Sequence, residues 1–240
     1  MNKRKLVIST IVLIIIWEIS SLILHKNILP SPFKVIMHLV SIFGDKLIIH
    51  TLYSFMRIVL GILFGVIIGW PLGIITGYFK KADAYLSPII YLLYPIPKIA
   101  LLPIFMLLFG LGESTKIMLI FIIVLFQIIV SIRDYIKELD PSLYYPLQTL
   151  GSKNSQIIRH ILIPATLPKL FSSIRISLGT SIAILFFSET FGTTYGLGYF
   201  IMDSMLRINY VEMYSGIIVL SLLGLTLFSF IDFICIKYIK

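Results

Sequence analysis

The sequence predicts an all-α integral membrane protein with six transmembrane helices. Hydrophobic residues make up 58% of the 240 residues and charged residues only 13%, and the mean hydropathy is +1.02. That composition excludes a soluble globular domain of this length. A helix needs roughly 20 apolar residues to cross a bilayer core of about 30 Å, and the chain offers six such stretches.

The six predicted spans are Leu6–Leu24, Ser54–Tyr78, Tyr85–Phe109, Ile117–Ile132, Leu170–Phe191 and Met213–Ile236. The basic start of the chain could belong to a signal peptide, but the first apolar stretch is too long and no small-x-small cleavage site follows it. We therefore predict a retained first span. After it, Pro30-Ser31-Pro32 precedes apolar residues at helical spacing, which predicts an exterior surface helix within 27–50.

The positions of the basic residues predict the orientation. With the N-terminus inside, the cytoplasmic segments hold thirteen of the 20 Lys and Arg residues and the exterior segments hold six. The exterior six are Lys26, Lys34, Lys46, Arg57, Lys116 and Arg207, and the cytoplasmic thirteen include Arg133, Lys137, Lys153, Arg159, Lys169 and Arg175. The positive-inside rule then places both termini in the cytoplasm. The partner of the net charge of +9 is the anionic membrane lipid rather than a nucleic acid.

The stretch Arg133–Leu170 is the one long polar interruption. Asp140 is a suitable N-cap with Pro141 at the first helical position, and Gly151 is suited to a left-handed stop. Ser152 is expected to cap a second short helix that Pro164 ends. That helix has one apolar face, formed by Ile157, Ile158, Ile161 and Leu162. Such an amphipathic piece is expected to lie at the membrane surface.

The second span has a glycine at every fourth position, which removes side-chain bulk from one helix face and allows another helix to approach closely. The five are Gly61, Gly65, Gly69, Gly73 and Gly77. The partner helix belongs either to the same subunit or to a second copy.

The third span is interrupted by Pro95, Pro97 and Pro103, and Lys98 lies near its middle. Prolines bend a membrane helix where it is buried in protein or lines a watery cavity. A lysine at this depth requires water, a carboxylate or an anionic solute. Pro97 and Lys98 are therefore candidates for the translocation path, with a structural lysine as the alternative.

The fifth span supplies further path candidates. Ser177, Ser181 and Ser188 fall within about 40° of one another at 100° per residue, on a face that either lines a polar route or packs against another helix. Glu189 requires water or a partner, for which Lys98 is a candidate. The exterior Gly192 and Gly196-Leu197-Gly198 turn follow.

Several kinds of chemistry are absent from the sequence. It contains no phosphate-binding loop of the Gly-x-x-x-x-Gly-Lys-Ser/Thr type, no His-Glu-x-x-His and no Gly-x-Ser-x-Gly. The single cysteine, Cys235, excludes an intrachain disulfide, and the four histidines are scattered. We predict no enzyme activity, no catalytic residue, no metal site and no cofactor in this chain.

Five motifs in order resemble those of permease subunits of bacterial ABC importers, in the sulfonate, nitrate, taurine and thiamine-precursor branch. They are Leu29-Pro30-Ser31-Pro32, the segment from Pro95 to Pro103, Phe109-Gly110-Leu111-Gly112-Glu113, the loop from Thr149 to Pro168, and Gly196-Leu197-Gly198-Tyr199. The family's Glu-Ala-Ala triplet before the loop glycine is replaced here by Tyr145, Pro146 and Leu147.

The resemblance implies a type I importer permease fold in a bacterial cytoplasmic membrane. Its domains would be an N-terminal helix and linker at 1–47, the permease domain at 48–236 with a cytoplasmic coupling loop at about 134–169, and a tail at 237–240. Coupling to a separate ATPase, which binds ATP and Mg, would involve Gly151, Ser152, Lys153, Asn154 and Pro164. A second copy and an extracytoplasmic solute-binding protein would complete the importer, which takes up a small anionic or heteroaromatic solute by alternating access.

Two other functional classes are open to a chain of this composition. An ion-driven secondary transporter or channel would use Lys98 and Glu189 as coupling groups, but the two halves show no inverted repeat: the glycine pattern of the second span has no counterpart in the fifth. An integral membrane enzyme would require clustered reactive residues, which the sequence lacks.

Overall fold

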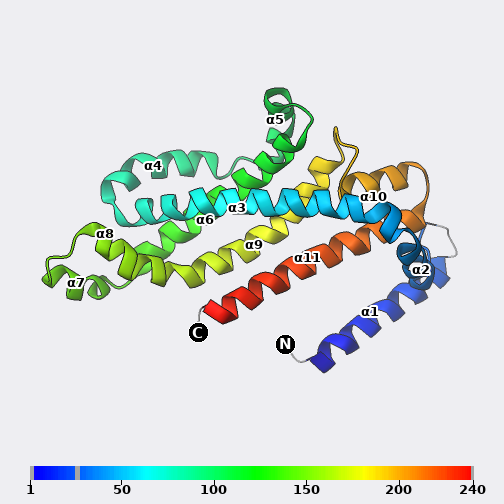
Figure 1. Cartoon of the computed structure of the whole chain (residues 1–240), viewed down its shortest axis with the longest axis horizontal. Helices are drawn as coiled ribbons and strands as arrows, with labels where there is room; N and C mark the ends of the chain where they lie inside the picture. The colour runs from blue at the N-terminus through cyan, green and yellow to red at the C-terminus, as the bar shows by residue number, and fades with distance from the viewer. Residues whose placement is uncertain (1–2, 25–27, 239–240) are drawn as a thin grey trace. The chain divides into compact units, whose positions relative to one another are not determined.

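The computed structural model describes residues 3–24 and 28–238, and helices joined by turns make up the described chain (Figure 1). Of the residues named above, Lys26 and the last two residues of the predicted tail lie outside this description. The helices are α1 Lys3–Leu24, α2 Pro32–Ile42, α3 Ile48–Tyr78, α4 Lys80–Leu93, α5 Leu102–Phe109, α6 Glu113–Glu138, α7 Tyr145–Thr149, α8 Asn154–Ile157, α9 Ile163–Glu189, α10 Leu197–Leu206 and α11 Tyr210–Tyr238.

The chain divides into two compact units. Unit 1 comprises residues up to 54 together with 193–223, and unit 2 comprises 55–192 together with 224–240. The helices α3 and α11 each begin in unit 1 and end in unit 2.

In unit 1, side chains of α1 bind the extended segment that precedes α2. Trp17 Nε1 donates to the carbonyl oxygen of Pro30 at 3.1 Å, and Ser21 Oγ donates to that of Leu29 at 2.8 Å. Ser31 then caps α2 by accepting a hydrogen bond from the Lys34 N–H, and Pro32 occupies the first turn. The Pro30-Ser31-Pro32 motif thus begins a helix, as its capping chemistry requires.

Unit 1 also contains a buried carboxylate. The Glu212 side chain is 5% exposed and forms ion pairs with two cations, Lys46 at 3.2 Å and Arg207 at 3.2 Å.

Also in unit 1, the N-terminus of α10 is capped by residues of α3. The Gly196 N–H donates to His50 Nδ1 at 3.1 Å and the Leu197 N–H to Ser54 Oγ at 2.8 Å. These contacts satisfy amide groups that a helix start leaves without intrahelical partners.

In unit 2, the glycine-bearing face of α3 lies directly against α6. A Cβ atom built on Gly65 would lie 2.5 Å from Val124 Cγ1, and one on Gly73 would lie 2.8 Å from Ile132 Cβ. Gly61, Gly69 and Gly77 face Ile120, Ile128 and Ile136 in the same way. The partner helix therefore belongs to the same subunit, and the two backbones approach so closely that no side chain fits at these positions.

Hydrogen bonds between side chains join α9 to α3 and α6 in unit 2. Trp70 Nε1 in α3 donates to Thr166 Oγ1 at 3.0 Å, and Ser173 Oγ in α9 donates to Ser131 Oγ in α6 at 2.6 Å. Such interhelical hydrogen bonds support helix packing in a membrane, where apolar burial contributes little. The helix α9 therefore lies against both α3 and α6.

The predicted third span is broken rather than bent. The helices α4 and α5 are separated by residues 94–97 and a 3₁₀ turn Lys98–Leu101, and the two helical parts are inclined by 84°. Pro95 and Pro97 lie in the break. Two prolines so close together remove two backbone N–H donors and disfavour helical geometry at the residue before each proline, so the helix does not continue here. Pro103 lies in the first turn of α5, where a proline is tolerated.

Four described helical stretches are long and apolar enough to cross a membrane. They are Pro32–Tyr78, Glu113–Glu138, Asn154–Glu189 and Tyr210–Lys237, and the pair α4 and α5 would make a fifth if both parts form one span. The described apolar part of α1, Ile8–Leu24, is shorter, so six spans stay a prediction. The span predicted as Ile117–Ile132 is longer than expected, because α6 also includes the polar residues at each end.

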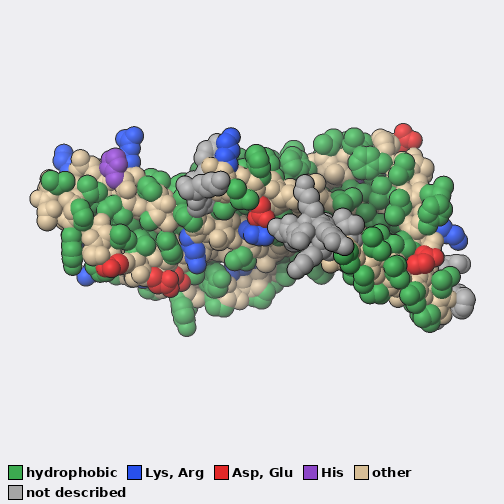
Figure 2. Space-filling view, turned by 90° about the horizontal axis from the view of Figure 1, so that it is seen from below, with side chains coloured by type: hydrophobic (Ala, Val, Ile, Leu, Met, Phe, Trp, Pro, Cys, Tyr) green, Lys and Arg blue, Asp and Glu red, His purple; other side chains and the backbone are tan. Residues whose placement is uncertain are grey.

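Exposed apolar side chains are abundant on the molecule. Hydrophobic side chains cover large areas of the face shown in Figure 2, and Ile23, Val40, Leu107 and Phe230 are each more than 60% exposed. An aqueous protein rarely exposes apolar surface on this scale. The surface is that of a protein whose solvent is lipid.

Candidate functional site

The polar segment between α6 and α9 begins as its sequence predicts. Asp140 caps the 3₁₀ turn Pro141–Tyr144 by accepting the Ser142 N–H at 2.8 Å. Hydrogen bonds from the backbone and hydroxyl of Ser142 hold the pKa of Asp140 below its usual value. The short helix α7 then ends at Gly151, whose φ of +69° lies in the left-handed region that favours glycine.

Beyond Gly151 the structure corrects two predictions. Ser152 does not cap the next helix: its Oγ has no hydrogen-bond partner in the described chain. Lys153 takes the N-cap position, and its N–H donates to Gln156 Oε1 at 2.7 Å. The side chain of Gln156, which folds back onto the Lys153 N–H, thus takes the place of the expected serine cap.

Pro164 does not end the second helix either. The chain passes from α8 through a π turn, Ile158–Leu162, directly into α9, so Asn154–Glu189 is one helical stretch of 36 residues. A proline removes one intrahelical hydrogen bond and its ring displaces the carbonyl four residues earlier. The wider π turn just before Pro164 provides that space, and the helix continues.

Aromatic and polar contacts hold this segment to the end of α3. Tyr78 Oη donates to Asn154 Oδ1 at 3.2 Å, and the rings of Tyr78 and Tyr144 lie 6.0 Å apart. Three apolar side chains around the Gly151 turn have no such cover: Leu143, Tyr145 and Leu150 are 47%, 59% and 81% exposed. The segment therefore presents an apolar surface next to a glycine joint.

At the other ends of α3 and α9, unit 2 contains a buried charge cluster formed by Arg57, Glu113, Lys116 and Glu189. Arg57 Nη1 donates to Glu189 Oε1 at 2.6 Å, and its Nε and Nη2 donate to both oxygens of Glu113 at 2.6 and 2.5 Å. The side chains of Arg57 and Glu189 are fully buried, and that of Glu113 is 40% exposed. With Lys116 included, the formal charges of the four members cancel, as burial requires.

Lys116, the fourth member, binds backbone carbonyl groups of two loops. Its Nζ donates to Leu111 O at 2.9 Å and Gly112 O at 3.2 Å, and lies 3.5 Å from Gly192 O. The charge cluster therefore connects α3, the start of α6, the end of α9 and the loops beside them. Glu113 and Glu189 thus both have positively charged neighbours in the membrane-spanning part of the chain.

Lys98 lies in the break between α4 and α5 and does not contact Glu189. Its Nζ donates to Leu93 O at 2.7 Å and Tyr94 O at 2.5 Å, which are the last carbonyl groups of α4, and it lies 5.1 Å from the centre of the Phe126 ring. A lysine commonly stabilises carbonyl groups at a helix C-terminus in this way. The pairing of Lys98 with Glu189 is therefore wrong, since Arg57 is the partner of Glu189.

The serine face predicted for the translocation path is turned inward. Ser177, Ser181 and Ser188 are at most 1% exposed, on the side of α9 from which Ser173 reaches α6. Ser188 Oγ donates to its own helix at Leu185 O, 2.9 Å away, whereas the Oγ atoms of Ser177 and Ser181 have no partner among the described residues. The helix α9 contacts the 3₁₀ turn Lys98–Leu101, and the described hydrogen bonds of Lys98 go to the carbonyl groups of α4 rather than to these serines.

Sequence reasoning assigned Arg57 and Lys116 to exterior segments and missed their role. Both are buried in helices, α3 and α6. Arg57 lies between the apolar residues Met56 and Ile58, and Lys116 directly precedes the apolar residues Ile117 and Met118. A charged residue within an apolar helical window calls for an opposite charge at similar depth, and Glu189 was the available signal.

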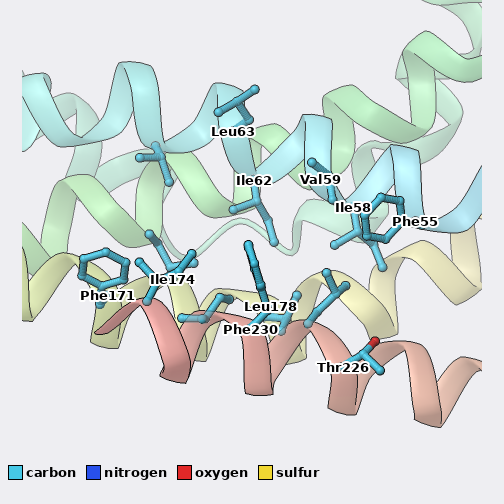
Figure 3. A pocket seen from close by; sticks show the side chains of 14 residues that line it. Phe55, Ile58, Val59, Ile62, Leu63, Phe171, Ile174, Leu178, Thr226 and Phe230 are labelled. Carbon is cyan, nitrogen blue, oxygen red and sulfur yellow. The ribbon is translucent and has the colours of Figure 1, made fainter. Parts of the chain in front are cut away.

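An apolar groove lies in unit 2. It has a volume of about 630 Å³ and lies between α3, α9 and α11. Figure 3 shows Phe55, Ile58 and Ile62 of α3 directed toward α9 and α11. Among its lining residues only Thr226 carries a polar side chain, so the groove lacks the few convergent polar groups by which a binding site recognises a polar solute.

Comparison with known proteins identifies relatives over most of the chain. Residues 61–235 match the family model described as the binding-protein-dependent transport system inner membrane component. The chain is 32% identical over 232 residues to the aliphatic sulfonates transport permease protein SsuC of Bacillus subtilis, covering 95% of this chain and 84% of that protein. It is 29% identical over 201 residues to the taurine transport system permease protein TauC of Escherichia coli, covering 81% and 73%.

Two further similarities extend this result. The chain is 27% identical over 220 residues to the formylaminopyrimidine transport permease protein ThiX of Halalkalibacterium halodurans, covering 91% of this chain and 88% of that protein. Its fold is similar to a chain of the MetNI methionine ABC transporter in an inward facing conformation, with a TM-score of 0.71 and 21% identity over 80% of this chain and 95% of that chain. The all-helical fold is thus that of an ABC importer permease. The chain belongs to the family of binding-protein-dependent transport system inner membrane components, as a permease subunit.

Proposed function

We propose that this chain is the permease of an ATP-driven importer in which a separate ATPase, bound at the loop 134–169, moves the membrane helices. The chain would work as a pair of copies with two ATPase subunits, which bind ATP and Mg, and with an extracytoplasmic solute-binding protein. Both termini and the loop would face the cytoplasm. The solute would be small and anionic or heteroaromatic, of the sulfonate, nitrate, taurine or thiamine-pyrimidine-precursor type, and the relatives' names, which refer to aliphatic sulfonates, taurine and formylaminopyrimidine, support this class.

One observation carries this proposal: a single helical stretch connects the loop to the buried charge cluster. Asn154–Glu189 is continuous over 36 residues, which is about 54 Å at 1.5 Å per residue. Its first residue contacts Tyr78 and its last is paired with Arg57. A displacement applied beside Gly151 would therefore reach the ion pairs at the far end of unit 2 without passing through a flexible joint.

The exposed surface of the loop is suited to a protein partner. Leu143, Tyr145 and Leu150 are exposed around Gly151, and an aromatic anchor with neighbouring aliphatic groups is typical of interface centres. Gly151, Ser152, Lys153 and Asn154 would form the contact, and Pro164 with its π turn would keep the helix continuous.

The test compares two substitutions of Gly151. A Cβ atom at this position meets no other atom within 4 Å, so Gly151→Val acts through its positive φ alone, at about 1–2 kcal/mol. Asn tolerates this conformation, and Gly151→Asn is the matched control. In inside-out vesicles that hold the assembled transporter, we expect Gly151→Val to lower ATP-driven solute transport and the accompanying ATP hydrolysis at least tenfold, while Gly151→Asn retains both.

Membrane insertion of both variants is measured in parallel and should equal that of the unaltered chain. The proposal is wrong if a tag placed beside Ser152 is reached only from outside the cell. It is also wrong if the purified chain moves solute with no nucleotide-hydrolysing subunit present.

A further inference from the structure

One side of α9 is exposed along the length of unit 2, opposite the buried serines. We name it the α9 exposed face; at 100° per residue its centre lies about 150° from Ser177 and Ser181. Small residues predominate along it, with one charged residue among them. Its members are Ser172, Arg175, Ile176, Gly179, Thr180, Ala183 and Phe187, all exposed.

Arg175 differs from Arg57 in its unused donors. Arg57 is fully buried and donates from Nε, Nη1 and Nη2. The Arg175 side chain is 57% exposed and has one contact within the described chain, an ion pair of 3.2 Å between its Nη1 and Asp232 Oδ1. The rest of its planar guanidinium is available to an oxyanion, which it matches in geometry.

The position of the pair excludes a simple lipid-facing arrangement. Arg175 lies five residues inside the predicted span Leu170–Phe191, roughly 8 Å from its start. A long arginine side chain reaches the headgroups from such a depth, but the short side chain of Asp232, roughly 9 Å before the end of α11, does not. An ion pair inside a span faces water or protein, and the Asp232 side chain is 41% exposed.

The rest of the α9 exposed face provides no other donor for an anion. Ser172 Oγ donates to Pro168 O at 3.1 Å and Thr180 Oγ1 donates to Ser177 O at 2.9 Å, so both hydroxyl protons are used within the helix. The apolar groove lies between α3, α9 and α11 and lacks charged residues. Arg175 is thus the member of the α9 exposed face whose donors an anion can bind.

We propose that the α9 exposed face lines the water-filled solute route and that Arg175 binds the oxyanion group of the solute there, a sulfonate or similar anion. Asp232 holds the guanidinium in place and weakens its attraction for anions enough to allow release. This assignment rests on the proposed function, because it takes the chain to be a solute permease. It replaces Ser177, Ser181 and Ser188, which lie on the buried side, as the polar lining contributed by α9.

The test uses the charge selectivity of cysteine modification beside Arg175. Cys235 is the only cysteine, so a Cys235→Ser background allows single cysteines at Ser172 and Gly179, one helical turn before and after Arg175. A Cβ at Gly179 has room, since its nearest neighbour is Phe228 at 3.9 Å. Each variant, assembled with its partners in vesicles, is treated with an anionic or a cationic methanethiosulfonate. The modification rate of the cysteine by each reagent is divided by the rate at which the same reagent modifies a free thiol in solution. Thiols react as thiolates, and hence where water reaches them.

We expect both cysteines to react, with the anionic reagent favoured roughly tenfold, the order of magnitude of one partly screened charge at this separation. Arg175→Gln should reverse the preference, because it leaves the Asp232 carboxylate unpaired, and Asp232→Asn should increase the preference for the anionic reagent. Ethanesulfonate in the buffer should slow modification when Arg175 is present and have no effect in Arg175→Gln. Matched cysteines at Ser177 and Ser181, on the buried side, should react at least tenfold more slowly.

Because Arg175→Gln leaves Asp232 unpaired, the double variant Arg175→Gln with Asp232→Asn serves as a second, neutral test. It should fold and show no charge preference. Equal rates for the two reagents in the unaltered background would overturn the proposal, as would unreactive cysteines at 172 and 179. If the charge preference changes with the phosphatidylglycerol content of the vesicles and ethanesulfonate does not protect, the anion is a lipid headgroup and the proposal is wrong.

This experiment separates the inference from the function on which it rests, because labelling requires no ATP hydrolysis. A charge-selective aqueous face in a chain that transports without an ATPase would refute the ATP-driven mechanism and leave Arg175 as the anion site. ATP-driven transport with unreactive cysteines at 172 and 179 would refute the Arg175 assignment alone.

Discussion

Arg57 and Glu189, both fully buried, form an ion pair with 2.6 Å between Nη1 and Oε1. They come from positions 132 residues apart in the sequence and join α3 to the last turn of α9. The desolvation of both charges is offset by the additional contacts with Glu113, so the three residues act together.

We expect Glu189→Gln to lower the free energy of unfolding by roughly 3 kcal/mol, because it leaves Arg57 buried with one carboxylate instead of two. Thermal unfolding of the detergent-solubilised chain measures the loss. The matched control is Glu138→Gln at the exposed end of α6, which should leave the melting temperature unchanged. Equal melting temperatures for both variants would contradict a structural role of the pair.

The close packing of the α3 glycines against α6 leads to a second prediction. Gly65→Ala would place a Cβ 2.5 Å from Val124 Cγ1, and we expect a loss of about 1–3 kcal/mol from overpacking. Gly179→Ala is the control, because its Cβ would have only an ordinary contact. Val124→Ala combined with Gly65→Ala should recover part of the loss. A stable Gly65→Ala variant would show that the two helices separate easily.

Lys98→Met distinguishes the two roles left open for Lys98. If the ammonium stabilises the carbonyl groups of Leu93 and Tyr94, the substitution should cost about 1–3 kcal/mol of stability, and Lys98→Arg should restore most of it. Thermal unfolding and solute uptake are measured on the same preparations. Loss of uptake at unchanged stability would instead make Lys98 a solute contact.

Ile208 is the one described non-glycine residue with a positive φ, +61°. A β-branched residue in this conformation is strained by about 1–2 kcal/mol. We expect Ile208→Asn to raise the melting temperature of the chain. Leu206→Asn, two residues earlier at the end of α10, should not raise it, and a lower melting temperature in Ile208→Asn would show that its side chain contributes more than the strain removes.

Local chemistry explains which elements were predicted well. The cap at Asp140 and the left-handed turn at Gly151 depend on interactions within three residues, and the structure shows both. The predictions of a Ser152 cap and of a helix end at Pro164 were wrong. Gln156, three residues after Lys153, caps the helix instead, and the π turn before Pro164 lets the helix continue past the proline. Alternative local hydrogen bonds of similar energy cannot be ranked from the residues alone.

The candidate sites were predicted less completely. Glu189 was recognised as a group that needs a partner, but Arg57 had been placed outside the membrane, because helix ends in apolar sequence are uncertain by several residues. The serine face of α9 was found by its spacing. Periodicity defines a face, yet it does not say whether that face meets another helix or water.

The sequence by itself determined a helical membrane protein, because apolar length, glycine spacing and turn chemistry are local properties of the chain, and its five motifs carried the resemblance to importer permeases. The tertiary structure decided that Arg57 neutralises Glu189, that Lys98 binds carbonyl groups of its own broken helix, and that Arg175 rather than the serines lies on the exposed side of α9. The pairing of Glu189 and the exposure of Arg175 depend on how α9 is rotated about its axis against α3 and α6. That rotation is fixed by contacts between residues far apart in the chain.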